Sequence, residues 1–313
     1  MFLLSVLFIS SCNEEIIIPE KNFSYEILSG NVGGISSISI NGDGDVAAWA
    51  GNSTYVILIS GRRLSGHIST INSVDLNRAG SLVLSGSNDN NIKLWDVNTG
   101  TLLRTFSEHI TTTKRVKFTP DEISVLSAEG NYIVYWRNAV SGFIAPLRMY
   151  GHLATVSSVE MNNDMTKIIS GSNDGTIKIW NEDTGELIHS INAHNGYTKD
   201  VKIDPTANRF ASCGTDSTIK IWDLNTFELI NILKKDLGKI NTISYHYSGN
   251  YIACGGFDNN IYIWDIKSST IVVTLTAHEK PVNSIEFSSS GDDLISGGAD
   301  GKVIIWRNVF SKK

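Results

Sequence analysis

The chain has 313 residues, of which 41% are hydrophobic and 19% charged, and its formal net charge at pH 7 is −6. This balance is typical of a globular protein and excludes a disordered or low-complexity chain. An acidic chain without blocks of Lys and Arg is a poor match for nucleic acid, so we expect no such partner. The three cysteines are too widely spaced for a disulfide framework or a zinc motif, and we expect no metal and no cofactor.

The N-terminus differs from the rest of the chain. Residues 2–9 are mostly apolar and lead to Ser10-Ser11-Cys12. The run is too short to cross a bilayer but has the length of a signal-peptide core. Because Ile9-Ser10-Ser11-Cys12 resembles a bacterial lipoprotein box, we expect a signal peptide over 1–11, lipidation of Cys12, a tether over 12–21 and anchoring to a membrane of the cell envelope. No Lys or Arg precedes the run. The alternatives are an apolar N-terminal strand or a disordered N-terminus, in a cytoplasmic protein.

One pattern recurs along the rest of the chain. Tryptophans stand at positions 95, 136, 180, 222, 264 and 306, at successive spacings of 41, 44, 42, 42 and 42. Upstream, AWAGNSTYVILIS (48–60) aligns with LSGSNDNNIKLWD (84–96) and makes a seventh repeat, in which Ile59 takes the place of Trp95. A period near 42 residues is typical of the blades of a β-propeller.

Within each repeat, apolar and polar residues alternate. In the fourth repeat the segments TVSSVEMN, TKIISGS, GTIKIWN and ELIHSIN are rich in Ile and Val and are separated by Asn, Asp and Gly. Short alternating runs bounded by these turn residues predict antiparallel hairpins. Four strands in each of seven repeats predict an all-β, seven-bladed propeller.

The two ends of the chain are predicted to meet in the last blade. That repeat ends just after Trp306 and has room for only three strands. Residues 22–31, NFSYEILSGN, align with fourth-strand segments such as GELIHSINAH (185–194). We therefore expect an N-terminal strand to complete the last blade within a propeller domain spanning residues 22–313, since closure removes an exposed sheet edge.

These repeats resemble the WD40 family. The tryptophan is followed by Asp at Trp95-Asp96, Trp222-Asp223 and Trp264-Asp265, and the opening Gly-His pair appears as Gly66-His67 and Gly151-His152. The resemblance covers residues 22–313 and implies a structural His, Ser, Asp and Trp tetrad in four blades. The four tetrads are His67, Ser85, Asp89 and Trp95; His152, Ser170, Asp174 and Trp180; His194, Ser212, Asp216 and Trp222; and His278, Ser296, Asp300 and Trp306.

A Ser, a His and an Asp in one neighbourhood also fit a hydrolase. The set recurs four times, which catalysis does not require, and no G-x-S-x-G elbow accompanies it. We therefore expect no catalytic residue among them. The third repeat is one residue short in its turn, Glu129-Gly130-Asn131, and is expected to lack the tetrad Asp. In the sixth repeat Cys254 takes the place of the serine.

The WD40 resemblance also implies three ring positions per blade on the top face of the propeller. The second ring consists of Ser36, Asn72, Lys114, Ser157, Lys199, Asn241 and Asn283. Most of the ring residues are small and neutral, but blades five and six contribute Tyr197, Lys199, Lys239 and Phe257. Aromatic and cationic residues are enriched in interface hot spots. These four residues, reinforced by Lys114, are expected to hold an acidic or phosphorylated segment of a protein partner, the alternative being an ordinary solvated rim.

Three classes of function follow. The first and favoured one is a non-catalytic protein-interaction scaffold that uses mainly the top face. The second is an extracytoplasmic propeller enzyme, which would need acidic or histidine residues on the top face, and the ring positions contain almost none. The third is a surface binder of small ligands or glycans, for which Tyr197 and Phe257 make only a small stacking platform.

Overall fold

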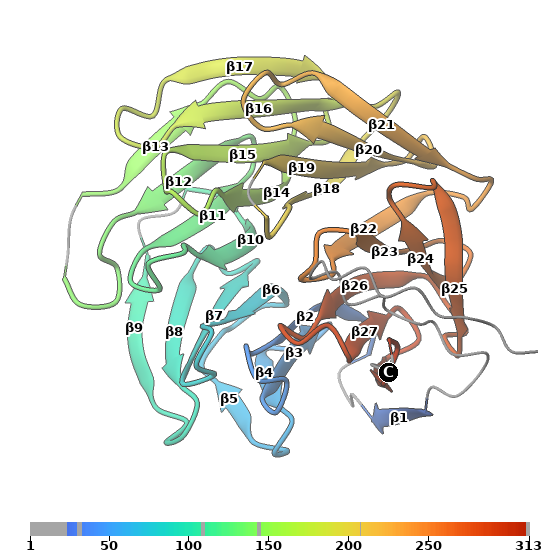
Figure 1. Ribbon diagram of the computed structural model, residues 1–313. Helices are drawn as coiled ribbons and strands as arrows, with labels where there is room; N and C mark the ends of the chain where they lie inside the picture. Colours follow the sequence, from blue (N-terminus) through green and yellow to red (C-terminus); the bar gives the residue numbers. More distant parts are fainter. Residues whose placement is uncertain (1–23, 30–32, 108–109, 143–144, 207, 311–313) are drawn as a thin grey trace, which may run out of the picture.

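The computed structural model describes residues 24–29, 33–107, 110–142, 145–206 and 208–310. Within these ranges the strands form seven four-stranded antiparallel sheets, arranged as blades around a central channel (Figure 1). The predicted all-β, seven-bladed propeller is therefore confirmed. No helix in this part of the chain is long and apolar enough to cross a membrane. Residues 1–21, with the expected signal peptide, Cys12 and tether, lie outside the described residues.

Each blade contributes strands at four distances from the channel, and the strands at each distance follow in order from blade one to blade seven. The inner strands are β2 (Ile35–Ile40), β6 (Ile71–Leu76), β10 (Thr113–Phe118), β14 (Val156–Met161), β18 (Thr198–Ile203), β22 (Ile240–Tyr245) and β26 (Val282–Phe287). The second strands are β3 (Ala47–Gly51), β7 (Leu82–Ser87), β11 (Val125–Glu129), β15 (Lys167–Ser172), β19 (Arg209–Gly214), β23 (Tyr251–Gly256) and β27 (Leu294–Gly298). The third strands are β4 (Tyr55–Leu58), β8 (Ile92–Asp96), β12 (Tyr132–Trp136), β16 (Thr176–Asn181), β20 (Thr218–Asp223), β24 (Asn260–Asp265) and β28 (Lys302–Arg307). The outer strands are β5 (Arg63–Ser65), β9 (Leu102–Phe106), β13 (Leu147–Tyr150), β17 (Leu187–Asn192), β21 (Leu229–Lys234), β25 (Thr270–Thr276) and β1 (Ser24–Ser29).

The turn between the second and third strands depends on one left-handed residue. Gly175 has a φ of 83°, and a Cβ there would lie 2.6 Å from the carbonyl oxygen of Gly196. At the same place in other blades Asn90, Ser217 and Asn259 adopt φ values of 64°, 64° and 70°. Gly, and to a lesser extent Asn, tolerates this conformation, which explains why the sequence signals turns with Asn, Asp and Gly.

The seventh blade contains both ends of the described chain. Strand β1 pairs antiparallel with β28, with Ser24 opposite Arg307 and Ser29 opposite Lys302. The blue strand β1 thus lies beside red strands from the other end of the chain (Figure 1). This pairing gives β28 a hydrogen-bonded neighbour where blade seven would otherwise end in an open sheet edge.

The core is divided among seven apolar clusters that lie between neighbouring blades. Between blades three and four, for example, Trp180 packs with Leu126, Ile133 and Met149 of the preceding blade. Six of the clusters contain the repeated tryptophan of a third strand in this way. Full burial of such large side chains makes them the principal apolar contribution at each blade interface.

Four blades contain a hydrogen-bonded chain of His, Ser, Asp and Trp. In blade four the Trp180 indole donates to Ser170 Oγ at 2.9 Å, and His152 lies 2.8 Å from the same oxygen and 3.0 Å from Asp174. Because the Asp174 carboxylate can only accept, His152 Nδ1–H donates to it, and the unprotonated Nε2 of the neutral ring accepts from the Ser170 hydroxyl. The same contacts, all between 2.8 and 3.0 Å, link the residues of blades two, five and seven.

Blade three replaces the missing Asp by another carboxylate. Ser127 donates to Glu129 at 2.8 Å, Tyr132 donates to its second oxygen at 2.8 Å, and the Trp136 indole donates to Ser127 at 3.1 Å. Glu129 is fully buried. The shorter turn therefore lacks the tetrad Asp. Glu129, at the end of β11, supplies a carboxylate acceptor for the serine hydroxyl instead.

Burial also sets how the propeller responds to acid. Burial lowers the pKa of His152 and outweighs the effect of its hydrogen bond to Asp174, and burial likewise lowers the pKa of the histidines of the other three tetrads. Burial alone would raise the pKa of Asp174, but hydrogen bonds from Thr176, the Leu153 N–H and His152 lower it to about 2. Both shifts make the native state less stable as the pH falls, because the unfolded chain then binds more protons than the native state does.

We expect the melting temperature to be highest above about pH 7 and to fall as the pH drops through the ordinary histidine pKa near 6.5. Below about pH 4 the depressed pKa of Asp174 adds a further loss of the same sign. Differential scanning calorimetry between pH 7.5 and 3.5 measures this dependence. A melting temperature that is constant or rises on acidification would contradict it.

Replacement of Ser170 by alanine tests the tetrad itself. The variant leaves His152 Nε2 and the Trp180 indole N–H without their shared partner in the interior, so we expect a loss of about 2–3 kcal/mol in the free energy of unfolding. Chemical denaturation measures this loss. Ser190→Ala, at an exposed position of the same blade, is the matched control and should change stability by less than about 0.5 kcal/mol. Equal effects of the two substitutions would exclude a stabilising tetrad.

Candidate functional site

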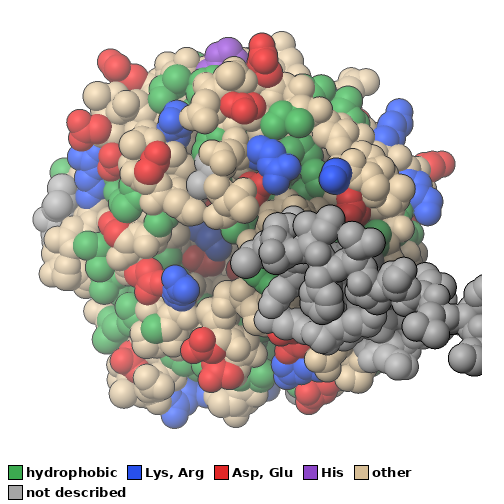
Figure 2. All heavy atoms as spheres, viewed as in Figure 1, with side chains coloured by type: hydrophobic (Ala, Val, Ile, Leu, Met, Phe, Trp, Pro, Cys, Tyr) green, Lys and Arg blue, Asp and Glu red, His purple; other side chains and the backbone are tan. Residues whose placement is uncertain are grey.

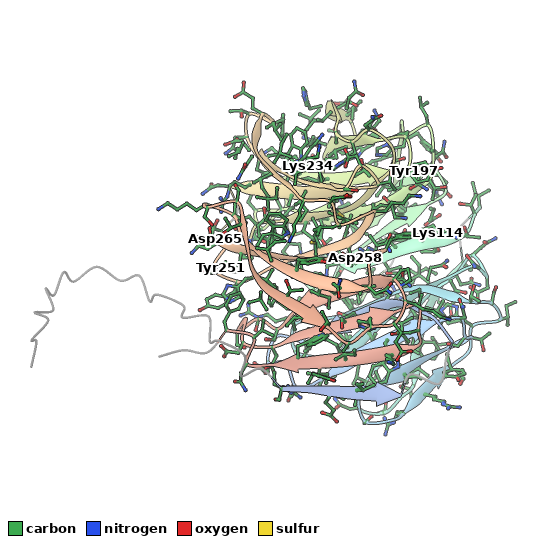
Figure 3. The ribbon with its side chains drawn as sticks, turned by 90° about the vertical axis from the view of Figure 1, so that its right-hand side faces the viewer. Lys114, Tyr197, Lys234, Tyr251, Asp258 and Asp265 are labelled. Atoms are coloured by element: carbon green, nitrogen blue, oxygen red, sulfur yellow. The ribbon has the colours of Figure 1, made fainter. Side chains whose placement is uncertain are left out.

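A cavity, which we call the channel mouth, opens at one end of the channel. It has a volume of about 580 Å³. Its lining residues are Ser36, Asn72, Lys114, Arg115, Thr155, Val156, Ser157, Asn173, Lys199, Asn241, Phe257 and Asn283. All seven second-ring positions are therefore in this one cavity. In Figure 3 Lys114 and Tyr197 lie at one side of the propeller, and Tyr251 and Asp265 lie at the other.

Five of the seven second-ring side chains are engaged in holding neighbouring blades together. Each donates a hydrogen bond to the first backbone carbonyl of the next inner strand. The bonds run from Ser36 to Ile71 (2.8 Å), Asn72 to Thr113 (2.8 Å), Ser157 to Thr198 (2.6 Å), Asn241 to Val282 (3.1 Å) and Asn283 to Ile35 (2.8 Å). The small polar residues at these positions are thus structural members of the ring.

The two remaining second-ring residues are lysines. Lys114 donates to the side-chain oxygen of Asn88 at 3.1 Å, a neutral acceptor that does not balance its charge. For Lys199 the described part of the chain provides neither a hydrogen bond nor an ion pair, although it lines the same cavity. Two ammonium groups that no described carboxylate pairs therefore face one cavity, where they can attract an anionic group.

The other predicted contact residues stand at different distances from the mouth. Phe257 lines the cavity and is 54% exposed, and Lys239 Nζ lies 5.5 Å from the centre of its ring, in cation–π range. Tyr197 is 52% exposed but lies outside the lining. The structure thus brings Lys114, Lys199 and Phe257 together, adds Lys239 through Phe257, and leaves Tyr197 on the rim.

The channel below the mouth contains a network of charged residues that was not predicted from the sequence. Arg115 reaches from blade three to Asp200 of blade five at 2.9 Å. The other pairs are Lys117 with Asp75 (2.8 Å), Lys117 with Glu286 (3.9 Å) and Lys202 with Glu160 (2.8 Å). The face shown in Figure 2 is hollowed near its centre, and Lys or Arg and Asp or Glu side chains lie in the hollow.

Electrostatics favours the ionised form of the pair between Arg115 and Asp200. Burial alone would raise the pKa of Asp200, but Arg115 and Lys202 lower it, and Asp200 in turn raises the pKa of Arg115. Glu286 differs, because burial raises its pKa despite the attraction of Lys117. A small cavity of about 20 Å³ among these residues has room for roughly one water molecule. A ligand at the mouth would therefore meet charged side chains beneath it.

The sequence does contain a signal for this network. Inner strands are buried, yet Arg115 and Lys117 occur at alternate positions of β10, and Asp200 and Lys202 occur at alternate positions of β18. Charged residues are almost never buried unless paired, so charges of both signs in the inner strands of different blades indicate ion pairs across the channel.

The His, Ser and Asp tetrads resemble a catalytic triad in their contacts but not in their access to solvent. Ser170 is fully buried and its oxygen already accepts the Trp180 indole. A substrate therefore cannot reach the hydroxyl. Among the described residues no group of three or more His, Cys, Asp or Glu side chains is arranged to hold a metal ion. Cys254 is also buried, and burial raises the pKa of its thiol to about 12, which keeps it protonated near neutral pH.

Known proteins share these repeats. Five segments, residues 58–96, 145–181, 185–223, 227–265 and 269–307, match the model of the WD domain, G-beta repeat. Eukaryotic translation initiation factor 3 subunit I of Phaeosphaeria nodorum is 30% identical over 224 residues, 58% of this chain and 61% of the relative. Its counterpart from Emericella nidulans is 28% identical over 59% of this chain and 60% of the relative. A WD repeat domain-containing protein 83 homolog from Dictyostelium discoideum is 32% identical over 37% and 36%.

The chain spans about three fifths of the length of the translation-factor relatives. These relatives are named as subunits of a larger factor, which agrees with the scaffold class expected from the sequence. The expected location at the cell envelope is wrong, because the relatives are translation initiation factors, which act at the start of protein synthesis. The expected location rested on an apolar run followed by Ser-Ser-Cys, a short pattern that arises easily by chance and that no Lys or Arg precedes in this chain.

The family, in contrast, follows from the chain as a whole. The matched segments cover more than half of its residues, and the seven four-stranded sheets and the repeated tetrads extend the pattern between them. The chain belongs to the WD40 family, proteins built from the WD domain with G-beta repeats.

Proposed function

We propose that the protein is a non-catalytic interaction scaffold that binds an acidic or phosphorylated segment of a protein partner at the channel mouth. The observation that carries this proposal is the pair of unneutralised lysines, Lys114 and Lys199, in a ring whose other five side chains are occupied by bonds between blades. The ligand's negative charge would supply the counterion that the described residues do not.

The neighbouring aromatic side chain supports a peptide as the ligand. Phe257 presents more than half of its surface beside the cavity, with Lys239 over its ring. An exposed aromatic next to cations favours a segment that combines an apolar residue with a carboxylate or phosphate. A cavity of about 580 Å³ can take a few side chains of such a segment.

The relatives support the scaffold class. Subunit I of translation initiation factor 3 is by its name one component of a multisubunit factor. A ring whose blades are joined by ion pairs in the channel is suited to present a surface to other subunits, and its tetrads are buried where no substrate can reach them. We therefore infer that this chain also works as a component of an assembly.

Charge reversal at the mouth tests the proposal. The double variant Lys114→Glu with Lys199→Glu should bind fluorescein-labelled glutamate-rich and phosphoserine peptides at least about tenfold more weakly than the unchanged protein. This estimate takes two surface charge contacts of about 0.7 kcal/mol each, plus the added repulsion. Fluorescence polarisation at low and high salt measures it, and binding by the unchanged protein should weaken more steeply with salt than binding by the variant.

Lys267→Glu is the matched control, because Lys267 is exposed and follows two residues after Asp265. Asp265 lies on the side of the propeller opposite Lys114 (Figure 3). This control has the same charge change as one mouth substitution and should leave peptide affinity unchanged. If the mouth variant binds as tightly as the unchanged protein, or if the control loses as much affinity, the mouth is not the binding site.

A further inference from the structure

Three aliphatic side chains near the channel mouth stand almost entirely in solvent. Ile68 of blade two is 87% exposed, Ile110 of blade three 74% and Leu153 of blade four 90%. Each precedes by four residues a second-ring residue that lines the mouth, in the order Asn72, Lys114 and Ser157. Because equivalent positions of consecutive blades follow one another around the ring, these side chains form an arc along one side of the mouth. We call them the aliphatic arc.

The fold does not require an apolar residue at this repeat position. In blades two and four the backbone N–H of the exposed residue donates to the tetrad Asp, at 3.0 Å from Ile68 and 2.8 Å from Leu153. In blades five and seven Asn195 and Glu279 donate the same bond, at 3.1 and 2.9 Å. A polar residue therefore serves the blade equally well, and the aliphatic side chains of blades two to four call for another explanation.

The backbone bond also prepares the arc for contact with a partner. Because the tetrad Asp holds the backbone of Ile68 and Leu153, these segments lose little conformational freedom on binding. Single exposed apolar residues are ordinary on a protein surface. Three at one repeat position of consecutive blades, beside a cavity with two unneutralised lysines, are typical of an interaction surface with apolar and charged parts.

We propose that the aliphatic arc contacts the same partner whose acidic segment binds the mouth, and that this partner presents apolar side chains next to its acidic residues. The contact rests on the proposed function, because Lys114 and Lys199 determine where the acidic segment lies. Ile110 precedes Lys114 by only four residues. A segment held at this lysine therefore reaches the arc with its next few residues, at about 3.3 Å for each extended residue.

This arrangement gives the partner one orientation. Charges at the mouth fix the register of the acidic residues, and burial of the arc adds affinity only when apolar side chains lie on the side of blades two to four. Phe257 and Lys239 belong to blade six and so stand outside the arc's sector. A simple polyanion would satisfy the lysines but leave the arc in water, so the surface selects an acidic segment flanked by apolar residues.

Labelled peptides of defined composition test the proposal. The first is the glutamate-rich peptide, and two others add a Leu-Ser-Leu-Ser-Leu extension at its N-terminus or its C-terminus. One extended peptide should bind the unchanged protein at least about tenfold more tightly than the first peptide, because it buries the arc. The triple variant Ile68→Ser, Ile110→Ser and Leu153→Ser should lose this gain and keep the affinity for the unextended peptide. Fluorescence polarisation measures both.

The double variant Leu187→Ser with Ile188→Ser is the matched control. These two aliphatic residues are also exposed but lie on the outer strand β17 of blade four. Their replacement removes exposed apolar surface away from the mouth and should leave the tenfold gain intact. The melting temperatures of both variants should equal that of the unchanged protein, since none of the five side chains is buried.

The possible failures are distinguishable. If the glutamate-rich peptide binds at the mouth but neither extension tightens binding, or if the triple variant keeps the gain, the arc is not part of the partner surface and the proposed function stands. If no peptide binds, both proposals fail. If the unchanged protein self-associates in sedimentation velocity and the triple variant does not, the arc is an interface between copies of this chain.

Discussion

The ring depends on how the inner strands satisfy their unpaired edges. Each inner strand is the last strand of its sheet, so one row of its backbone N–H groups faces the channel without a partner strand. A side chain of the preceding blade accepts many of these donors: Ser37 accepts from Val74 at 3.1 Å, Ser73 from Val116 at 3.2 Å and Ser284 from Ile38 at 3.2 Å. Because buried N–H groups must be paired, this exchange fixes the register of each blade against the next and closes the circle from blade seven to blade one.

The charged channel follows from the same requirement. Where the acceptor is a carboxylate instead of a hydroxyl, a charge enters the channel: Asp75 accepts from the Phe118 N–H at 2.7 Å and Asp200 from the Ile243 N–H at 3.2 Å. A buried carboxylate then requires a cation, which Lys117 and Arg115 supply. The ion pairs between blades are thus a consequence of how the edges are satisfied.

The sequence predicted the features that repeat and missed those that occur once. The 42-residue period, the strand alternation and the four tetrads recur, so one blade explains the others. The ion pairs join single residues of different blades, and alternation along a strand does not show which blades face each other across a closed ring. Glu129 was missed because it substitutes for the tetrad Asp from a different position in the turn. Ring positions carried over from the family identified the residues of the mouth, but they could not show that five of those residues are already hydrogen-bonded between blades or that Tyr197 stands on the rim.

Blade one shows what happens when a repeat no longer carries the tetrad. Trp49 stands where the other blades have the tetrad serine, so within the described residues no serine accepts its indole and no third-strand tryptophan covers the outer part of the interface. The same interface is the point where the ring is closed by β1, a strand from the opposite end of the chain. An ordinary tetrad with a third-strand tryptophan would give this interface the packing of the other six. The two irregular features of the ring, the missing tetrad and the strand taken from the opposite end of the chain, therefore meet at one interface, and this interface has the least repeated packing to hold it together.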